Sequence, residues 1–466
     1  MRGTRSPVAR AVVVGAGIVG AACARELARA GCAVTLVDRG GAASGTTAHG
    51  EGNILLSDKG PGPELELARL SRALWPPVLA EIAGSTPRGA ALVRAVEWEP
   101  KGGLVVATTE AGAAGLARFA AGQRAAAVRC EPLDPAQTAA AEPFLTRAHR
   151  AVLHYPEDAQ VQPAAAATAL LADARAAGAR LRTGCEVLGA RTRGGRLTAL
   201  HTTAGLLEAD LFVNAAGPWA GSVAARLGAP VDVRPRRGDV LVTTPQPPTV
   251  FHKVYDADYV GAVGSDDSGL QTSAVVESTR AGSLLLGSSR RRVGFDDRLR
   301  PEVLAAIAAK AIRLFPALAA VPVMRAYGGF RPYVPDHLPV IGADPRLTGL
   351  WHAGGHEGAG IGLSLGTARL LRALILGTPA PLDPEPFRVD RPAVLGTAGP
   401  ARDGAGAPGH GSSPEHPQHP GGTAQLATPA TPATPATPAT PATPATPATP
   451  AAPATPAAPA ERKEGP

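Results

Sequence analysis

The most informative segment of this chain reads Ala11-Val12-Val13-Val14-Gly15-Ala16-Gly17-Ile18-Val19-Gly20. Its β-branched run predicts a short strand, and residues 21–30 continue in the pattern of a helix. A G-x-G-x-x-G turn between a strand and a helix is typical of a dinucleotide site. Gly15 permits the tight turn, Gly17 lets the backbone approach a pyrophosphate, and Gly20 lets the helix pack closely on the strand. The segment therefore predicts a Rossmann-type dinucleotide-binding domain.

A second strand and its last residue strengthen this interpretation. The run Ala33-Val34-Thr35-Leu36-Val37 leads into Asp38. This carboxylate lies near the spacing of about 20 residues that is expected for a ribose-binding acid. An acid at this place also argues against a 2′-phosphate on the cofactor. Two alternatives stay open here: the glycines could form only a tight turn in a doubly wound sheet, and the motif alone does not separate NAD from FAD.

The end of the chain has a different composition from its body. Large apolar residues are lost from about Ala393, and an Ala-Thr-Pro repeat begins at Ala427. Proline at every third position blocks helices and sheet ladders, while Ala and Thr bury too little area to offset the entropy of ordering. We therefore predict a disordered tail over residues 393–466 and a folded body from about Arg10 to Asp390, long enough for two joined domains.

Composition argues against several other classes of protein. The 466-residue chain has a net charge of +7, but its arginines are scattered and aromatic residues make up only 4% of it, so nucleic-acid binding is not expected. Four widely spaced cysteines without a C-x-x-C pair predict neither a zinc site nor an iron–sulfur cluster, and they fit a reducing cytoplasm. No membrane span is expected, because the apolar run 363–376 is interrupted by Arg369 and Arg372.

Four further blocks resemble the D-amino-acid oxidase (DAO) superfamily of FAD-dependent oxidoreductases, in the same order. The first, Arg39 to Thr47 (RGGAASGTT), is similar to its flavin-cradling loop, and the second, Val213 to Ala220 (VNAAGPWA), to its turn beside the cofactor. The third, GFRP at 329–332 with PVIG at 339–342, matches its substrate-side signature. The fourth, His352 to Gly362 (HAGGHEGAGIG), resembles its C-terminal glycine loop.

Residues 45–70, which include EGNILLSDK at 51–59, look closest to the branch of D-hydroxyproline dehydrogenase, opine oxidase and hydrogen cyanide synthase subunits. That branch implies electron-transfer partner subunits that carry iron–sulfur clusters or a second flavin. Glycine and sarcosine oxidases of the same superfamily use oxygen directly instead. The sarcosine oxidases tether their flavin through a cysteine after the third block, where Tyr333 and Val334 stand here, so FAD is expected to be bound non-covalently.

The resemblance implies a fold that combines α/β and α+β parts. A discontinuous Rossmann-type (GR2-like) FAD-binding domain is expected over residues 8–95, 150–230 and 325–380. A mainly antiparallel substrate domain is expected over 96–149 and 231–324. The residues expected to contact the cofactor are Gly15, Ala16, Gly17, Ile18, Val19, Gly20, Asp38, Arg39, Ser44, Gly45, Thr46, Val187, Ala216, Gly217, Trp219, Gly355, His356, Gly358, Ala359, Gly360 and Ile361.

Arg331 is the expected substrate anchor, because a guanidinium group can bind a carboxylate through two parallel hydrogen bonds. The resemblance supports the same role. Tyr255 and His356 are further candidates for catalysis, and Glu357 for contact with a substrate amine. Spacing does not select among other possible pocket residues, which are Tyr259, His252 and Tyr333. Glycine oxidases carry a second arginine in the last block, where this chain has Gly358.

These observations predict an FAD-dependent enzyme that oxidises the amine carbon of a small amino or imino acid by hydride transfer to flavin N5. The substrate is expected to be of the D-amino acid, D-hydroxyproline or opine type. Three alternatives remain at this stage: a glycine or sarcosine type of oxidase, a nicotinamide-dependent dehydrogenase, and a flavin-bearing subunit without catalytic activity of its own.

Overall fold

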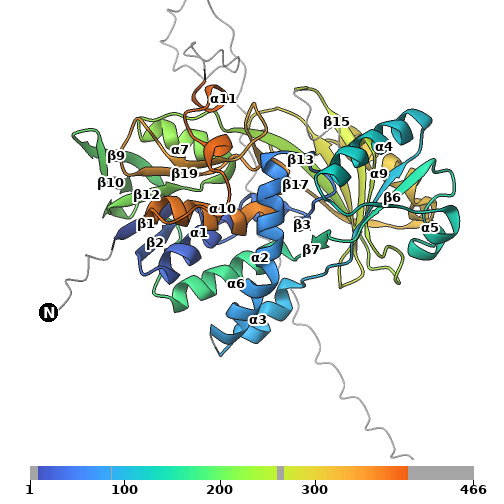
Figure 1. The fold of residues 1–466 in the computed structure, drawn as a ribbon, viewed down its shortest axis with the longest axis horizontal. Coiled ribbons are helices and arrows are strands. Elements are labelled where there is room, and N and C mark those ends of the chain that lie inside the picture. The colour runs from blue at the N-terminus through green and yellow to red at the C-terminus, as the bar shows by residue number, and fades with distance from the viewer. Residues whose placement is uncertain (1–8, 86, 260–266, 397–466) are drawn as a thin grey trace, which may run out of the picture. The chain divides into compact units, whose positions relative to one another are not determined.

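A six-stranded sheet carries the glycine motif near its middle (Figure 1). The structure is a computed structural model that describes residues 9–85, 87–259 and 267–396. The sheet order is β18 (Val340–Ala343), β19 (Leu350–Gly354), β12 (Leu211–Asn214), β1 (Arg10–Val14), β2 (Ala33–Val37) and β8 (Arg180–Arg182). Five of these strands run parallel, and β18 pairs antiparallel with β19. This is the doubly wound arrangement expected from the β-α-β pattern.

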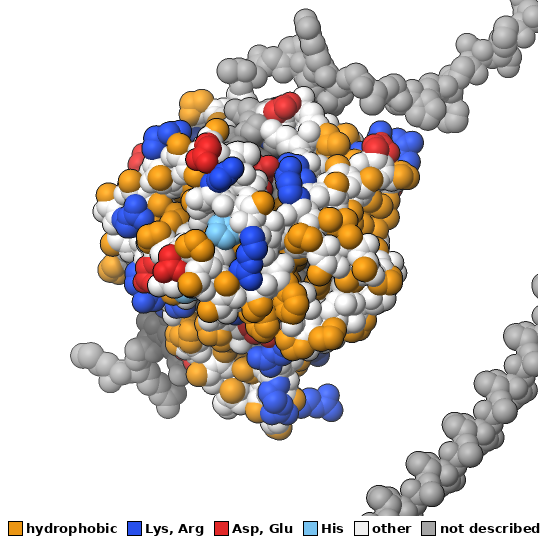
Figure 2. All heavy atoms as spheres, turned by 90° about the vertical axis from the view of Figure 1, so that its right-hand side faces the viewer, with side chains coloured by type: hydrophobic (Ala, Val, Ile, Leu, Met, Phe, Trp, Pro, Cys, Tyr) orange, Lys and Arg blue, Asp and Glu red, His pale blue; other side chains and the backbone are white. Residues whose placement is uncertain are grey.

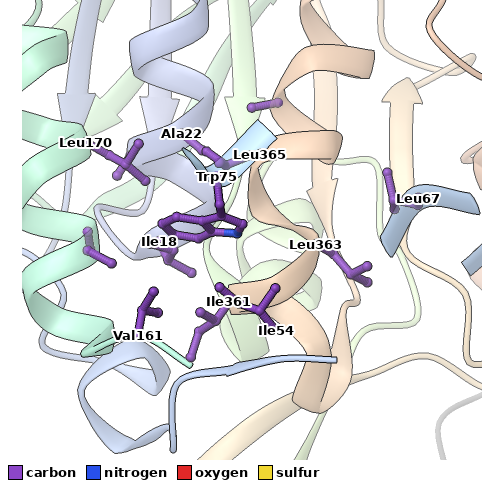
Figure 3. Packing of buried hydrophobic residues seen from close by; sticks show 14 of the residues in the cluster. Ile18, Ala22, Ile54, Leu67, Trp75, Val161, Leu170, Ile361, Leu363 and Leu365 are labelled. Atoms are coloured by element: carbon purple, nitrogen blue, oxygen red, sulfur yellow. The ribbon is translucent and has the colours of Figure 1, made fainter. Parts of the chain in front are cut away.

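Helices cover the six-stranded sheet. They are α1 (Ile18–Arg29), α2 (Pro63–Ser85), α3 (Gly89–Val96), α6 (Pro163–Ala176), α7 (Ala220–Arg226) and α10 (Gly360–Leu376). Helix α1 is rich in alanine and buried along nearly its whole length, which lets α6 and α10 pack closely beside it. The indole ring of Trp75 on α2 fills the space between α1 and α10, next to Ile18 and Leu365 (Figure 3).

The segment Glu357–Leu376, which contains α10, is long and apolar enough to cross a membrane by length and composition alone. In the structure, 61% of the most apolar 18-residue stretch of this segment is buried. The segment packs against α1 and α2, so its apolar side chains contribute to the protein core.

A second, eight-stranded sheet forms the other main layer. Its order is β17 (Val323–Tyr333), β13 (Arg234–Thr243), β16 (Leu284–Arg290), β15 (Gln271–Ser278), β14 (Lys253–Asp256), β4 (Gly103–Ala107), β6 (Ala151–Tyr155) and β5 (Glu131–Pro132). All pairs are antiparallel except β4 with β14. The helices of this part are α4 (Glu110–Ala125), α5 (Pro135–Ala141) and α9 (Pro301–Leu314), and α9 packs on β13, β15 and β16.

The smaller elements complete the described residues. A three-stranded antiparallel sheet joins β9 (Val187–Arg193), β10 (Arg196–Thr202) and β11 (Gly205–Glu208), and β3 (Asn53–Ile54) pairs with β7 (Ala159–Gln160). Short helical turns are η1 (Thr46–His49), η2 (Gly217–Trp219), η3 (Pro316–Ala320), η4 (Glu357–Ala359), η5 (Glu385–Phe387) and α11 (Pro392–Leu395). Figure 2 views the eight-stranded-sheet side, where charged side chains are interspersed with hydrophobic ones.

The predicted fold class is confirmed, but two segment boundaries need correction. Strands β6 and β17 belong to the eight-stranded sheet, although residues 150–230 and 325–380 were expected in the cofactor-binding part. The cause is pairing between residues far apart in sequence: β17 pairs with β13 from Arg234–Tyr333 to Thr243–Val323. Local sequence patterns do not contain this information.

The packed chain also extends beyond the predicted limits of Asp390 and residue 393. The Arg391 guanidinium donates hydrogen bonds to both carboxylate oxygens of Asp336 at 2.8 and 3.2 Å, and Val394 is fully buried. One arginine side chain and one apolar turn therefore anchor the end of the body. Residues 397–466, which include the Ala-Thr-Pro repeat, lie outside the described residues.

These contacts predict different results for two truncations. Ending the chain after Asp390 removes Arg391 and Val394, so we expect the free energy of unfolding to fall by about 2 to 4 kcal/mol. Ending it after Gly396 keeps both residues and should leave the free energy of unfolding unchanged. Urea denaturation of the two truncated proteins and the full chain measures the difference. Equal stability of both truncated proteins would contradict the anchoring role of these residues.

Candidate active site

A cavity of about 550 Å³ lies where the carboxyl ends of the parallel strands face the eight-stranded sheet. The carboxyl ends of β1, β2, β12 and β19 contribute Gly15, Asp38, Ala215 and Gly354 to its lining. Strands β13 and β17 contribute residues from the opposite side. Ligands of open α/β sheets bind at this edge of the sheet, where strand order reverses.

The turn between β1 and α1 has the geometry that its glycines predict. Gly15 has a φ of +107°, and a Cβ atom there would lie 2.4 Å from the Ala215 carbonyl oxygen. A Cβ atom at Gly20 would lie 1.8 Å from the Gly15 carbonyl oxygen. Gly17 precedes the first turn of α1 and lines the cavity, so the positive end of the helix dipole faces the space where an anion would bind.

Asp38 and Thr47 hold this turn in place. The Asp38 carboxylate accepts hydrogen bonds from the backbone N–H groups of Ala16 at 2.7 Å and Gly40 at 2.8 Å. The Thr47 hydroxyl accepts one from the N–H of Ile18 at 3.0 Å. Asp38 therefore orders the glycine turn and also presents its carboxylate at the cavity wall.

Aromatic rings stack along another part of the wall. The guanidinium of Arg39 lies 4.2 Å from the ring centre of Trp219, and Trp219 stacks on Phe295 with nearly parallel rings 5.3 Å apart. Phe330 completes the row in an edge contact with Phe295. All four side chains line the cavity. Stacked apolar faces of this kind suit a planar aromatic ligand.

Glycines form the part of the wall that belongs to the eight-stranded sheet. Gly238 on β13 and Gly329 on β17 are paired in register, and both line the cavity. Side chains at these two positions would collide with Arg331 and His49 respectively, since the added Cβ atoms would lie 2.1 and 2.7 Å away. The two glycines therefore leave room for the side chains of Arg331 and His49, which line the cavity against the sheet.

The C-terminal glycine loop approaches the same place from the six-stranded sheet. His356 lies 2.8 Å from the Thr367 hydroxyl, and burial lowers the pKa of its imidazole to about 4, so this ring is neutral near pH 7. Glu357 pairs with Arg236 at 3.2 Å and with His337 at 2.8 Å. A Cβ atom at Gly358 would lie 3.5 Å from Nε of Arg331, so the loop packs directly beside that arginine.

Arg331 is the charged group best placed to hold an anion. Its Nη1 donates to the Ser289 carbonyl oxygen at 2.9 Å, and among the described residues no carboxylate pairs with it. Burial, and then the charge of neighbouring Arg290, lower the pKa of the guanidinium to about 10, so Arg331 remains protonated near neutral pH. A buried cation without a counterion favours an anionic ligand.

Most of the residues predicted from the sequence line the cavity. Those that do are Arg331, Gly15, Gly17, Ile18, Val19, Asp38, Arg39, Ser44, Gly45, Thr46, Val187, Ala216, Gly217, Trp219, His356, Gly358, Gly360 and Ile361. Four others shape the wall from behind without lining it, namely Ala16, Gly20, Gly355 and Ala359. Of the less specific candidates, Tyr259 and Glu357 line the cavity, whereas His252 and Tyr333 do not.

The candidate role of Tyr255 needs correction. Its ring is fully buried, it is absent from the cavity lining, and its hydroxyl donates to the Ser57 hydroxyl at 2.5 Å. Strand β14 is buried on both faces, so alternation of residue types did not indicate which way this side chain points. Tyr255 therefore belongs to the core, where Asp158 accepts hydrogen bonds from Leu56 and Ser57.

Several cavity residues were missed from the sequence, most notably Glu51, Phe295 and His49. Phe295 follows β16 in a segment without a recognisable motif. Glu51 lies in the segment that suggested the branch, but nothing in its spacing indicated a role. Among the residues that the structure describes, no cluster of three or more His, Cys, Asp or Glu side chains could hold a metal ion.

Comparison with known proteins identifies relatives of this chain. The sequence profile of the DAO family, described as FAD dependent oxidoreductase, matches residues 10–374. The chain is 29% identical to the glycine oxidase of Geobacillus kaustophilus over 386 residues, which cover 81% of this chain and 96% of that protein. It is 31% identical to the hydrogen cyanide synthase subunit HcnC of Pseudomonas aeruginosa over 262 residues, 56% of this chain and 59% of that protein.

Solved structures of other proteins have a similar fold. The crystal structure of the glycine oxidase from Geobacillus kaustophilus has a TM-score of 0.73 and 27% identity, over 82% of this chain and 99% of that one. The L-proline dehydrogenase from P. horikoshii, with a TM-score of 0.72 and 22% identity over 82% of this chain and 97% of that one, shares the fold. The resemblance inferred from the four sequence blocks is thereby confirmed, as is FAD as the cofactor of the family.

The residues of the cavity fit this cofactor, and Asp38 provides a test. Replacing Asp38 by alanine removes a carboxylate at the expected ribose position and the acceptor of two backbone N–H groups. We expect FAD affinity to fall by about 1.5 to 3 kcal/mol, because hydrogen bonds to charged groups have this magnitude. Fluorescence titration of the FAD-free protein with FAD measures the change. An unchanged affinity would show that Asp38 does not contribute to cofactor binding.

Proposed function

This chain belongs to the FAD dependent oxidoreductase family, and we propose that it oxidises the amine carbon of a small amino or imino acid. The observation that carries the proposal is Arg331, a guanidinium group that lines the cavity without a carboxylate partner among the described residues. An amino acid supplies the missing carboxylate. Relatives named glycine oxidase and D-amino acid dehydrogenase support the same substrate class.

The protein residues bind and orient the substrate. The planar guanidinium of Arg331 donates hydrogen bonds to the substrate carboxylate and thereby fixes the adjacent carbon in one position. Gly238 leaves space for the guanidinium of Arg331 against the sheet. When bound, FAD supplies the acceptor for a hydride. The amine carbon loses that hydride and the nitrogen loses a proton, which leaves a carbon–nitrogen double bond that water converts to an oxo acid and an amine or ammonia.

Within this class we propose a substrate of the D-amino acid, D-hydroxyproline or opine type. The resemblance of residues 45–70 to the branch that acts on such compounds supports this choice. Glycine oxidases carry an arginine at the place of Gly358, and this difference supports a substrate other than glycine. With glycine there, the loop packs against Arg331 without adding a second charge of its own.

The electron acceptor distinguishes two forms of the proposed enzyme. Transfer to a partner subunit is supported by similarity to HcnC, which is itself named a subunit. Direct use of oxygen is supported by similarity to glycine oxidases along nearly their whole length. Oxygen consumption compared with reduction of an artificial dye separates the two, since only the second form turns over with oxygen alone.

Product analysis tests the proposed reaction. The FAD-loaded protein is incubated with a dye acceptor and a panel of glycine, D-alanine, D-proline, L-proline and 4-hydroxy-D-proline. We expect at least one of them to give an oxo acid with ammonia, or a cyclic imine, in step with dye reduction. No product from any of these amino acids, nor from an opine in the same assay, would contradict the proposal and would favour a flavin-bearing subunit without catalytic activity.

A further inference from the structure

Glu51 is unusual among the acidic residues that line the cavity. Asp38 accepts two backbone N–H groups, Glu186 pairs with Arg226, and Glu357 pairs with Arg236 and His337. Glu51 has only a long contact of 3.4 Å from the Asn53 amide to its Oε2. Its Oε1 is buried and has no hydrogen-bond partner among the described residues.

Lys253 does not neutralise this carboxylate by direct pairing. Lys253 is fully buried and donates to Glu277 at 2.5 Å. A buried acceptor without a donor costs about 1 to 3 kcal/mol, and more when the acceptor is charged. Glu51 lines the cavity, so its carboxylate is a candidate acceptor for a donor that a ligand brings.

The position of Glu51 relative to Arg331 is set by strand β16. Arg331 extends from β17 across Gly238, where no side chain stands in its way, and Nη1 reaches the Ser289 carbonyl. Oε1 of Glu51 lies against Gly287 of the same strand, since a Cβ atom there would be 2.3 Å away. Only one residue separates Gly287 from Ser289, so Glu51 and Arg331 meet neighbouring parts of the same strand.

A cation and an anion that line the same cavity match the two charges of an amino acid. One end of an α-amino acid carries the carboxylate, and the adjacent carbon carries the amine. With a hydrogen bond at each end, the molecule can join a guanidinium group to a nearby carboxylate. The cation and the anion on the protein are thus arranged as the complement of the substrate.

We propose that the carboxylate group of Glu51 recognises the substrate amine by accepting its N–H, while Arg331 holds the substrate carboxylate. This inference rests on the proposed function and adds the residue that requires a basic nitrogen next to the carboxylate. The carbon between the two charged groups of the substrate is thereby fixed by both residues.

Two measurements on the FAD-loaded protein test the inference. For the amino acid, the concentration dependence of the rate of anaerobic flavin reduction in a stopped-flow instrument gives the Kd; for the unreactive analogue, perturbation of the flavin absorbance gives it. The probes are the panel amino acid that the parent oxidises fastest and its amine-free analogue: propionate for alanine, acetate for glycine, tetrahydrofuran-2-carboxylate for the prolines. In Glu51→Gln, we expect the Kd of the amino acid to rise about 10- to 150-fold, as for loss of a charged hydrogen bond. The Kd of the analogue should change less than twofold.

Three further variants make the result specific. Glu51→Asp keeps the charge but withdraws it by one methylene, so it should give an intermediate Kd for the amino acid. Glu131→Gln makes the same chemical change at an exposed residue of β5 and should bind both probes as the parent does. Arg331→Ala should lose affinity for both probes, which separates loss of the carboxylate anchor from loss of amine recognition.

Each possible outcome either supports or overturns the role of Glu51. Unchanged amino-acid affinity in Glu51→Gln, equal weakening of both probes, or loss of FAD from this variant would overturn the inference and leave the proposed function standing. If no amino acid of the panel and no opine reacts with the parent, the proposed function fails and the inference fails with it.

Discussion

Replacing Arg331 by alanine is expected to lower kcat/KM toward an amino acid by about 30-fold to several thousandfold while FAD remains bound. Truncating one partner of a desolvated charge pair costs roughly 2 to 5 kcal/mol, and that range corresponds to this loss of rate. The loss is large because Arg331 lines the cavity and, among the described residues, has no carboxylate to share its charge with. Steady-state kinetics with a dye acceptor measure the effect.

Two comparisons identify the cause of that loss. Arg331→Lys should recover only part of kcat/KM, because an ammonium group cannot form the two parallel hydrogen bonds of a guanidinium. Arg325→Ala makes the same truncation at an exposed position of the same strand and outside the cavity, and it should leave kcat/KM unchanged. If Arg331→Ala prefers the amino acid over the matching amine as strongly as the parent does, the carboxylate binds elsewhere.

Gly15→Ala is expected to have the largest effect on stability and cofactor retention. The new methyl group would lie 2.4 Å from the Ala215 carbonyl oxygen, and the residue would have to keep a φ of +107°. Both problems involve backbone, which a rotamer change cannot relieve. We expect the free energy of unfolding to fall by about 3 kcal/mol or more, with loss of bound FAD.

The control for Gly15 is another glycine replaced by the same residue. Gly115 lies in α4 with an ordinary helical backbone, and nothing lies within 4 Å of a Cβ atom added there. Gly115→Ala should therefore raise the free energy of unfolding by about 0.5 to 1 kcal/mol. Urea denaturation of the FAD-free proteins compares them. Equal stability of the two variants would mean that the turn after β1 tolerates a side chain.

The sequence was most informative where chemistry depends on neighbours in the chain. The turn at Gly15, the strand end at Asp38 and the helix beginning at Gly360 each follow from a local pattern, and the structure has all three at the cavity. Arg331 was found because the resemblance supplied a role for it. Its position over Gly238, however, depends on the pairing of β13 with β17.

What the sequence could not indicate depends on contacts between distant residues. Glu51 gains its significance from Gly287, which is more than two hundred residues away in the chain. Tyr255 was misassigned because a strand buried on both faces has no alternating pattern to orient it. The end of the body was placed too early because composition did not reveal the hydrogen bonds of Arg391.

Anaerobic reduction of the bound FAD by three matched compounds tests most directly whether the enzyme oxidises a carboxylate-bearing amine. The compounds are the panel amino acid that the parent oxidises fastest, the amine that lacks its carboxylate, and the acid that lacks its amine. For a proline these are the amino acid, pyrrolidine and tetrahydrofuran-2-carboxylate. We expect the amino acid to bleach the flavin rapidly, the amine much more slowly, and the acid not at all. Bleaching by the amine as fast as by the amino acid, or no bleaching by any amino acid of the panel or by an opine, would contradict this expectation.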